Sequence, residues 1–433
     1  MTVVLFALLA SLAAGLLKFV ALSRGDDFMR IGIIGGGASG LISAIFSKTK
    51  NNEVIIFERN NFCGKKILAT GNGRCNYWNT NQTLGHYQSN NNELINNIVN
   101  DDIDNQVLEF FNKLGIVPKI KNGYYYPFSN QASTVKNALT YEIERLGIKV
   151  LNNFLVQNIT VEDNKFIVSS ENEDIIVDKL IIATGSCASP KTGSDGMGYK
   201  FLKDLGHTII KPLPSLVQLK TNGNFLKIWA GVRTEAKVTL YEDGKFIKEE
   251  LGELQLTNYG ISGICVFNLS NYVARGLDNN KKEEISIDFM PFIEVDKKSW
   301  FIEFTNLTNK NIKELLLSIL NEKIVEVILK ESKINSSKLF TELNKEEQNI
   351  LINYCTNFKL QVTRTNSFNE AQVCSGGICL TEVNLDTMES KIIKNLYVVG
   401  EILDITGDCG GYNLGIAWRT GIISGNAIRG NDD

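Results

Sequence analysis

One stretch near the start of the chain constrains the fold more than any other feature. It runs from Arg30 to Glu58 and reads RIGIIGGGASGLISAIFSKTKNNEVIIFE. A short apolar run at Arg30–Ile34, predicted as a strand, is followed by glycines spaced G-x-G-x-x-G and by apolar residues at helical intervals over Leu41–Lys48. A second apolar run at Glu53–Phe57, also predicted as a strand, ends in the acid Glu58. This order is typical of a strand–helix–strand unit that binds a dinucleotide, although glycine-rich turns also occur in other α/β proteins.

Each residue type in this unit has an expected task. Gly35 allows the tight turn out of the first strand, Gly37 lets the backbone approach a pyrophosphate, and Gly40 lets the helix pack on the sheet. The start of the helix presents unpaired N–H groups and a positive dipole end to the phosphates. An acid about 20 residues further on binds a ribose hydroxyl. The residues predicted to contact the dinucleotide are Gly35, Gly37, Ala38, Ser39, Gly40 and Glu58.

Composition narrows the class of protein. The chain has 433 residues, enough for two or three domains, and a formal net charge of −3 with acids and bases mixed along it. This charge balance indicates no nucleic-acid partner. The eight cysteines include no C-x-x-C pair and there are only two histidines. We therefore predict no metal site, and free thiols in a reducing cytoplasm.

Residues 1–28 form a separate apolar segment, in which Thr2–Leu17 is almost entirely apolar. Such a segment can cross a bilayer, and Lys18 and Arg24 on its downstream side would keep the body of the chain in the cytoplasm. A second interpretation is a translation-start artefact, because Met29 directly precedes the first strand. A cleaved signal is the third, although a positively charged start is lacking. The expected location is cytoplasmic, with or without a membrane anchor.

A glycine-rich and basic loop follows between Arg59 and Asn79. A loop of this composition after a ribose-binding acid is well placed to cover phosphates or a flavin ring, and the alternative is a solvated surface loop. The residues predicted to bind the cofactor here are Arg59, Lys65, Lys66, Gly71, Asn72, Gly73, Arg74, Cys75 and Asn76. Further along, Tyr124–Tyr126 form an aromatic cluster that either walls a pocket or packs half-buried.

Two later glycine turns complete the predicted site. The apolar strand Lys179–Ile182 ends in Ala-Thr-Gly, and in flavoproteins with two dinucleotide-binding units that strand runs beneath FAD. Near the C-terminus, the strand Leu396–Val399 ends in a glycine and an acid, and another glycine turn precedes a small-residue helix from Leu414 to Gly425. A tight turn with a packing helix is the alternative for this last segment. These turns contribute Ala183, Thr184, Gly185, Gly400, Glu401, Asp404, Gly410, Gly411, Asn413 and Leu414.

Changes of periodicity divide the rest of the chain. Residues 29–214 are predicted as the first part of the cofactor-binding domain and residues 215–360 as an inserted β-barrel and helical domain that shapes the substrate site. Residues 361–433 return to the first domain as its second part, with a strand at Lys359–Val362 at the boundary. A helix is expected at Asn92–Leu114 and a strand at Cys265–Leu269.

Four motifs carry a family resemblance. They are Thr70–Asn76 (TGNGRCN), Gly260–Gly263 (GISG), Thr387–Lys391 (TMESK), and Gly400–Leu414 with its GEILD and GGYNL ends. With these motifs the chain, from Arg30 to Gly425, resembles the bacterial NAD(P)/FAD-dependent oxidoreductases of the aminoacetone-oxidase-like and 3-dehydro-bile acid delta(4,6)-reductase-like type. The resemblance implies bound FAD, an α/β Rossmann-like FAD-binding domain of the two-dinucleotide-binding flavoprotein type, and an inserted β-barrel plus helical domain. Ile378-Cys379 and Gly415 depart from the family pattern.

The leading functional prediction is hydride transfer. NADH or NADPH reduces FAD, and hydride passes to an electron-poor C=C bond, such as that of an enone in a steroid- or bile-acid-like small molecule. No second G-x-G-x-x-G follows a strand, so the nicotinamide cofactor is expected to visit transiently. The catalytic candidates are Tyr412, Arg74 and Cys409, with a tyrosine suited to give a proton and an arginine to stabilise an oxyanion. The alternatives are a flavin oxidase of a small amine, and a flavin-binding subunit of a membrane or RNA-modifying complex.

Overall fold

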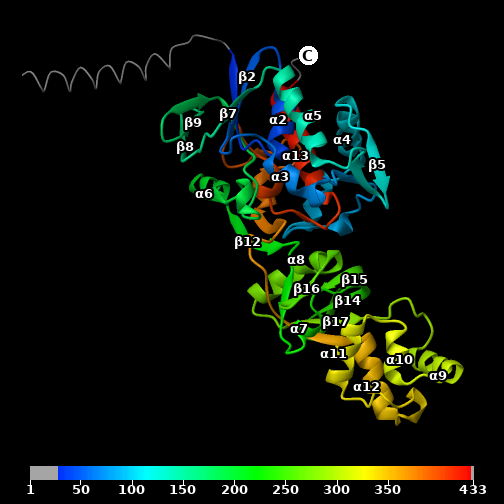
Figure 1. Ribbon diagram of the computed structural model, residues 1–433. Helices are drawn as coiled ribbons and strands as arrows, with labels where there is room; N and C mark the ends of the chain where they lie inside the picture. Colours follow the sequence, from blue (N-terminus) through cyan, green and yellow to red (C-terminus); the bar gives the residue numbers. More distant parts are fainter. Residues whose placement is uncertain (1–27, 431–433) are drawn as a thin grey trace, which may run out of the picture.

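The computed structural model describes residues 28–430 (Figure 1). The predicted anchor, signal or start artefact falls on residues 1–28, which lie outside the described residues except for the last one. Across residues 28–430, none of the helices is both long and apolar enough to cross a membrane. Figure 1 shows an α/β domain and, beyond it, a barrel that carries a helical extension.

The α/β domain is built on a seven-stranded sheet with the strand order β20-β21-β22-β11-β1-β2-β7. The strands are β1 (Met29–Ile34), β2 (Asn52–Glu58), β7 (Lys149–Asn152), β11 (Lys179–Ile182), β20 (Val383–Asn384), β21 (Glu389–Ser390) and β22 (Leu396–Val398). β1 pairs in parallel with both β2 and β11, and β11 pairs in parallel with β22. Because these strands run the same way, their carboxyl ends meet at one edge, where ligands bind in open α/β sheets.

Two helices from opposite ends of the chain pack against each other beside this edge. They are α2 (Ala38–Ser47) and α13 (Tyr412–Arg429), which appear as adjacent blue and red helices in Figure 1. Their closeness requires small residues, since a Cβ at Gly421 would lie 2.9 Å from Ile42 Cγ2 and one at Gly425 would overlap Phe46. The contact brings the first and last glycine turns of the chain to the same place.

The remaining elements of the α/β domain cover the sheet and its edges. The helices are α3 (Lys65–Ala69), α4 (Asp101–Lys113), α5 (Ala132–Arg145) and α6 (Met197–Asp204). Two small sheets contain β3 (Trp78–Asn79), β5 (Pro118–Lys121) and β6 (Tyr124–Pro127), and β8 (Asn158–Glu162), β9 (Lys165–Ser169) and β10 (Asp174–Val177). β4 (Tyr87–Gln88) pairs with β23 (Thr406–Gly407). Short 3₁₀ turns occupy Thr70–Gly73, Leu84–His86, Asn92–Asn97, Pro190–Thr192, Leu380–Glu382 and Gly400–Ile402.

The inserted domain contains a closed six-stranded barrel with its own apolar core, as the sequence predicted. Its strands are β13 (Leu219–Thr221), β14 (Arg233–Glu242), β15 (Lys245–Leu256), β16 (Gly260–Ser262), β17 (Glu283–Asp288) and β18 (Phe358–Thr365). The helices are α7 (Leu226–Trp229), α8 (Ile264–Asp278), α9 (Lys297–Thr308), α10 (Ile312–Leu317), α11 (Glu322–Ser332) and α12 (Lys345–Thr356), and a 3₁₀ turn lies at Phe340–Glu342. β12 (Ile209–Ser215) and β19 (Val373–Ile378) form the antiparallel link between the domains.

Three local predictions were wrong. Cys265–Leu269 is the start of helix α8 and not a strand, because a short apolar run does not distinguish a buried helix from a buried strand. The strand predicted at Lys359–Val362 belongs to β18, which closes the barrel and does not return to the first domain. The helix predicted at Asn92–Leu114 is a 3₁₀ turn followed by α4, and Asn100 caps α4 by accepting a hydrogen bond from Ile103 N at 3.2 Å.

Candidate functional site

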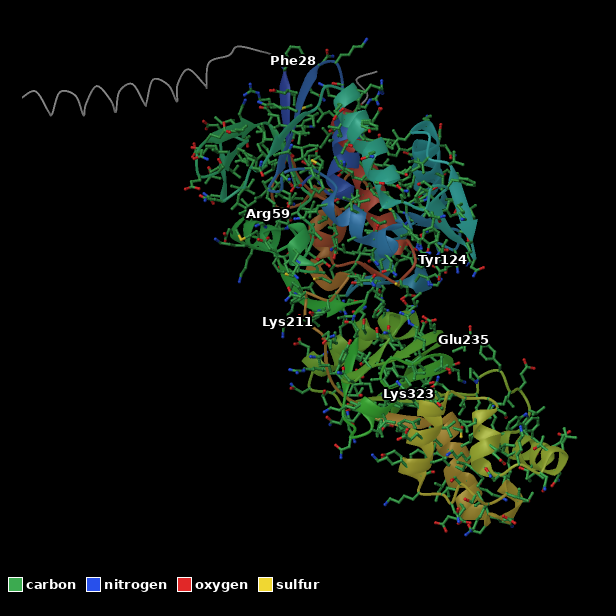
Figure 2. The ribbon with its side chains drawn as sticks, viewed as in Figure 1. Phe28, Arg59, Tyr124, Lys211, Glu235 and Lys323 are labelled. Carbon is green, nitrogen blue, oxygen red and sulfur yellow. The ribbon has the colours of Figure 1, made fainter. Side chains whose placement is uncertain are left out.

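A cavity of about 550 Å³ opens where the glycine turns of the α/β domain converge, at the carboxyl ends of β1, β2 and β11. It continues to the barrel, which contributes Ile264 and Phe267 from the first turns of α8. Figure 2 labels two residues of its lining, Arg59 and Tyr124, both from the α/β domain, and Tyr124 lies on the side that faces the barrel. The cavity therefore extends from the dinucleotide motif to the junction of the two domains.

The first glycine turn packs tightly against backbone at Gly35 and Gly40 and is open to the cavity at Gly37. Gly35 has a φ of +104°, and a Cβ there would lie 2.5 Å from the carbonyl oxygen of Ala183. A Cβ at Gly40 would overlap the carbonyl oxygen of Gly35. At Gly37, in contrast, a Cβ would meet nothing within 4 Å, and no side chain caps the N-terminus of α2 there. Gly37 thus leaves open space in front of uncapped helix N–H groups, which is the environment that a pyrophosphate needs.

Glu58 is held rigidly at the end of β2. It is 6% exposed, and its Oε2 accepts a hydrogen bond from Gly36 N at 2.8 Å. Its Oε1 accepts two bonds of 2.7 Å from the backbone and side-chain nitrogens of Asn60. These contacts fix the carboxylate in the lining of the cavity.

The basic loop covers the cavity from one side. Its members in the lining include the predicted Lys65, Lys66, Gly71, Asn72, Arg74 and Asn76. The Arg74 guanidinium lies 5.2 Å from the centre of the Tyr126 ring and the residue is exposed, so its charge stays available at the cavity. The Oδ1 atom of Asn76 is buried and has no hydrogen-bond partner within residues 28–430. A buried acceptor without a donor on the cavity wall fits a ligand that carries donor groups.

A second charged group is fixed by an ion pair. Glu401 Oε2 lies 2.6 Å from Lys66 Nζ, and its Oε1 accepts hydrogen bonds from Ser186 Oγ at 2.6 Å and from Cys374 N at 3.2 Å. Glu401 and Lys66 both line the cavity. The pair ties the C-terminal glycine turn to the basic loop, although the two are more than 300 positions apart in the sequence.

The last glycine turn, before α13, also lines the cavity. Gly411 has a φ of +95°, and a Cβ there would lie 2.8 Å from the carbonyl oxygen of Trp78. Asn413 locks the turn, since its Oδ1 accepts from Gly407 N and its Nδ2 donates to Gly407 O, both at 2.8 Å. The lining from this turn comprises Cys409, Gly410, Gly411, Asn413 and Leu414.

Most of the predicted site residues are brought together here, and six are not. Those in the lining also include Gly35, Gly37, Ala38, Ser39, Arg59, Ala183, Thr184 and Gly185. Those absent from it are Gly40, Gly73, Cys75, Gly400, Asp404 and Tyr412. Gly40 and Gly400 act through backbone packing: Gly400 has a φ of +80° and donates its N–H to Thr420 Oγ1 at 2.9 Å. Cys75 is fully buried, and burial raises its thiol pKa to about 12.

Asp404 and Tyr412 are buried in contacts with other parts of the protein and do not line the cavity. Asp404 is fully buried, accepts a hydrogen bond from Asn90 N at 2.8 Å, and lies 3.4 Å from Arg275 of α8, so that it joins the two domains. Tyr412 is 4% exposed and its ring stacks on His86, with 4.5 Å between the ring centres. Tyr412, one of the three catalytic candidates from the sequence, therefore packs against His86 and does not line the cavity.

Several lining residues were not assigned to the site from the sequence. They are Phe154–Val156, Leu216, Gln372 and Val373, Ile264 and Phe267, and Tyr124 with Tyr126. The tyrosines gave a signal as an aromatic cluster, but a run of aromatic residues is as common in packed cores as in pockets. Ile264 and Phe267 carried no signal, because their segment was interpreted as a barrel strand.

Comparison with known proteins identifies a family and several relatives. The HI0933-like protein Rossmann domain family matches residues 29–427. The 3-dehydro-bile acid delta(4,6)-reductase of Clostridium scindens is 38% identical over 402 residues, which cover 92% of this chain and 98% of that protein. The ribosomal RNA dihydrouridine synthase of Escherichia coli is 28% identical over 392 residues, which cover 90% of this chain and 95% of that protein. Among solved structures, a flavocytochrome c3 fumarate reductase in its open conformation is 13% identical with a TM-score of 0.48, covering 96% of this chain and 80% of that one.

Proposed function

Because the chain belongs to the HI0933-like family of Rossmann-domain proteins and is an FAD-dependent oxidoreductase, we propose that it reduces an electron-poor C=C bond conjugated to a carbonyl group, with NADH or NADPH as the reductant. The observation that carries this proposal is the shape of the cavity. One end has the open glycine turn and the rigid acid that suit a dinucleotide, and the other end reaches an apolar wall from the inserted domain. A small molecule with a ring system fits such a wall.

The names of the two sequence relatives support the reaction class. A delta(4,6)-reductase of a 3-dehydro bile acid saturates double bonds of a ring ketone. A dihydrouridine synthase adds two hydrogens to a double bond of the uracil ring. The two substrates differ greatly in size and charge, but both reactions saturate a C=C bond that is conjugated to a carbonyl group. An activity shared by relatives at 38% and 28% identity is a sound starting point for this chain.

The residues that line the cavity are suited to FAD, and they indicate which groups would bind each part of it. The uncapped N-terminus of α2 beside Gly37 would bind the pyrophosphate, and Glu58 would bind the adenosine ribose. The basic loop would cover the phosphates and the flavin, with Asn76 Oδ1 available to accept a hydrogen bond. Bound FAD supplies the hydride-transfer chemistry, and the protein orients the reactants and excludes water.

Two lining residues have further expected tasks at the junction of the domains. Arg74 would stabilise negative charge that develops on the carbonyl oxygen of the substrate, since it is a permanent cation that faces the cavity. Cys409 stays a thiol at neutral pH, because burial raises its pKa to about 12. It would therefore act as a contact for the substrate and not as a nucleophile.

A ribosomal RNA substrate is a second candidate, and one observation favours it: the identity to the dihydrouridine synthase extends over 95% of that protein. The net charge of −3 favours the small-molecule substrate, since proteins that bind RNA usually carry a strongly basic surface.

Anaerobic spectroscopy of the purified, FAD-loaded protein separates the candidates. NADH and NADPH are added first, and we expect one of them to bleach the flavin absorbance. Cyclic enones of increasing size and unmodified ribosomal RNA are then added to the reduced protein, and small amines are added in a separate experiment to the oxidised protein. Recovery of the flavin absorbance with an enone, together with the saturated ketone as product, supports the proposal.

Other outcomes contradict the proposal in distinguishable ways. Bleaching by an amine and recovery only in air would identify a flavin oxidase. Dihydrouridine formed in the RNA, without any enone turnover, would establish the second candidate. A Gly37→Val variant serves as the control, because it places a side chain in the space at the glycine turn, where an added Cβ meets nothing within 4 Å.

A further inference from the structure

We propose that Tyr124 donates the proton that completes the reduction, an inference that rests on the proposed function. Saturation of a conjugated C=C bond breaks the π bond and forms two C–H bonds. A hydride adds to the β-carbon, the electron pair of the π bond moves onto the carbonyl oxygen as an enolate, and a proton then adds to the α-carbon. The protein must supply that proton at a position next to the substrate.

Tyr124 is fixed at the right part of the cavity. It begins strand β6, and its register partners are Asn79 of β3 and Lys121 of β5. The ring packs on Gly410, which has a φ of +133°, and a Cβ at that glycine would lie 2.6 Å from Tyr124 Cε1. Tyr124 thus stands beside the glycine turn before α13, on the side of the cavity that meets the barrel (Figure 2).

The hydroxyl group of Tyr124 is free to act on a ligand. Within residues 28–430, no protein group forms a hydrogen bond with it, whereas the hydroxyl of Tyr87 bonds both Gln82 and Arg419. Burial, with smaller contributions from Cys409, Tyr126, Glu250 and Asp408, raises the pKa of Tyr124 above its usual value. The phenol is therefore protonated at neutral pH and has a proton to give.

The other proton-bearing groups in this part of the cavity are less suited. Tyr412 is buried against His86 and lies outside the lining. The Cys409 thiol already has an acceptor, since its Sγ lies 4.0 Å from Gln372 Oε1, and Arg74 is a permanent cation. Tyr126 lies beneath the Arg74 guanidinium, which leaves Tyr124 as the phenol next to the α13 turn.

The test uses a Tyr124→Phe variant of the full-length, FAD-loaded protein, with Tyr125→Phe as the matched control. Tyr125 is the next residue of the same strand, but its ring packs edge-on to Tyr77 and it lies outside the cavity lining. Two substrates are compared, a cyclic enone and a cyclic nitroalkene. A nitroalkene accepts hydride without a proton donor, because the nitronate anion that forms is stable, absorbs in the near ultraviolet, and takes up a carbon-bound proton slowly in water.

With the enone, we expect Tyr124→Phe to lower turnover by about 10²- to 10⁴-fold and Tyr125→Phe to leave it unchanged. With the nitroalkene, we expect the variant to release nitronate, detected by its absorbance, while the wild-type protein and the control release the nitroalkane. Reduction of the flavin by NADH or NADPH should be the same in all three proteins, which shows that folding and FAD binding are intact.

The outcomes separate the two proposals. Wild-type enone turnover in Tyr124→Phe, or direct formation of nitroalkane by that variant, would overturn the role of Tyr124 while the proposed function stands. If the wild-type protein reduces neither substrate, the proposed function fails and the proton-donor role fails with it.

Discussion

A buried carboxyl group in the barrel, far in sequence from the glycine turns, offers a direct test of the structure. Glu283 begins β17 and is 1% exposed, and neither of its carboxyl oxygens has a hydrogen-bond partner within residues 28–430. Glu242 lies directly opposite it in the strand ladder, and Gly276 of α8 packs so closely that a Cβ there would overlap Glu283 Oε1. Burial, and then the charges of Glu242 and Asp243, raise its pKa from 4.5 to about 7.

The raised pKa makes a contribution to stability that depends on pH. At low pH the carboxyl is protonated in both the folded and the unfolded chain, so the two states bind the same number of protons and stability does not depend on pH. As pH rises above 4.5, the unfolded chain releases the proton while the folded chain retains it until about pH 7, so the folded state loses stability over this window. At about 1.4 kcal/mol per pH unit, the total loss by pH 8 is about 3 kcal/mol.

A Glu283→Gln variant should abolish this loss, since glutamine has the same shape and no charge. We expect the variant to gain about 2.5 kcal/mol of unfolding free energy over the wild-type protein on going from about pH 5 to about pH 8, since part of the loss has already occurred at pH 5. Urea unfolding at the two pH values measures the difference. Glu284→Gln is the matched control, because its neighbouring carboxylate is partly exposed and lies 2.7 Å from Lys359 Nζ. If the stability difference between Glu283→Gln and wild type is the same at both pH values, the pKa of Glu283 is not raised in the folded protein.

Two further substitutions test the site and its supporting core. Gly37→Val should weaken FAD binding at least about tenfold, measured by flavin titration, and leave the melting temperature of the FAD-free protein unchanged, because the new side chain enters the space kept for the pyrophosphate. Gly85→Val, whose Cβ also meets nothing within 4 Å, is its control and should bind FAD normally. Arg419→Met should lower the unfolding free energy by about 3–5 kcal/mol in urea, because the fully buried guanidinium lies 2.6 Å from Asp104 Oδ1 and its loss leaves that carboxylate unpaired. An Arg419→Met protein as stable as wild type would show that the buried pair is dispensable.

Local sequence patterns predicted the cofactor-binding edge closely. The first strand was expected at Arg30–Ile34 and is observed at Met29–Ile34, and the second at Glu53–Phe57 is observed at Asn52–Glu58. These segments are predictable because the glycine spacing, the apolar runs and the acid are all contained within 29 consecutive residues, so each constrains the others. The segment at Cys265–Leu269 had no such neighbours, and its apolar run alone left helix and strand equally open.

Two helices preceded by glycine turns, and an acid and a basic loop after the first of them, can be recognised in the amino-acid sequence alone. Which side chains face the cavity follows only from how distant segments pack together. Tyr412 and Tyr124 both stand beside glycines, yet His86 covers the ring of Tyr412 while the missing side chain of Gly410 makes room for Tyr124. Whether a side chain is exposed depends on its contacts with segments that are hundreds of residues away in the chain. A local sequence pattern contains no information on those contacts, so it could not distinguish Tyr412 from Tyr124.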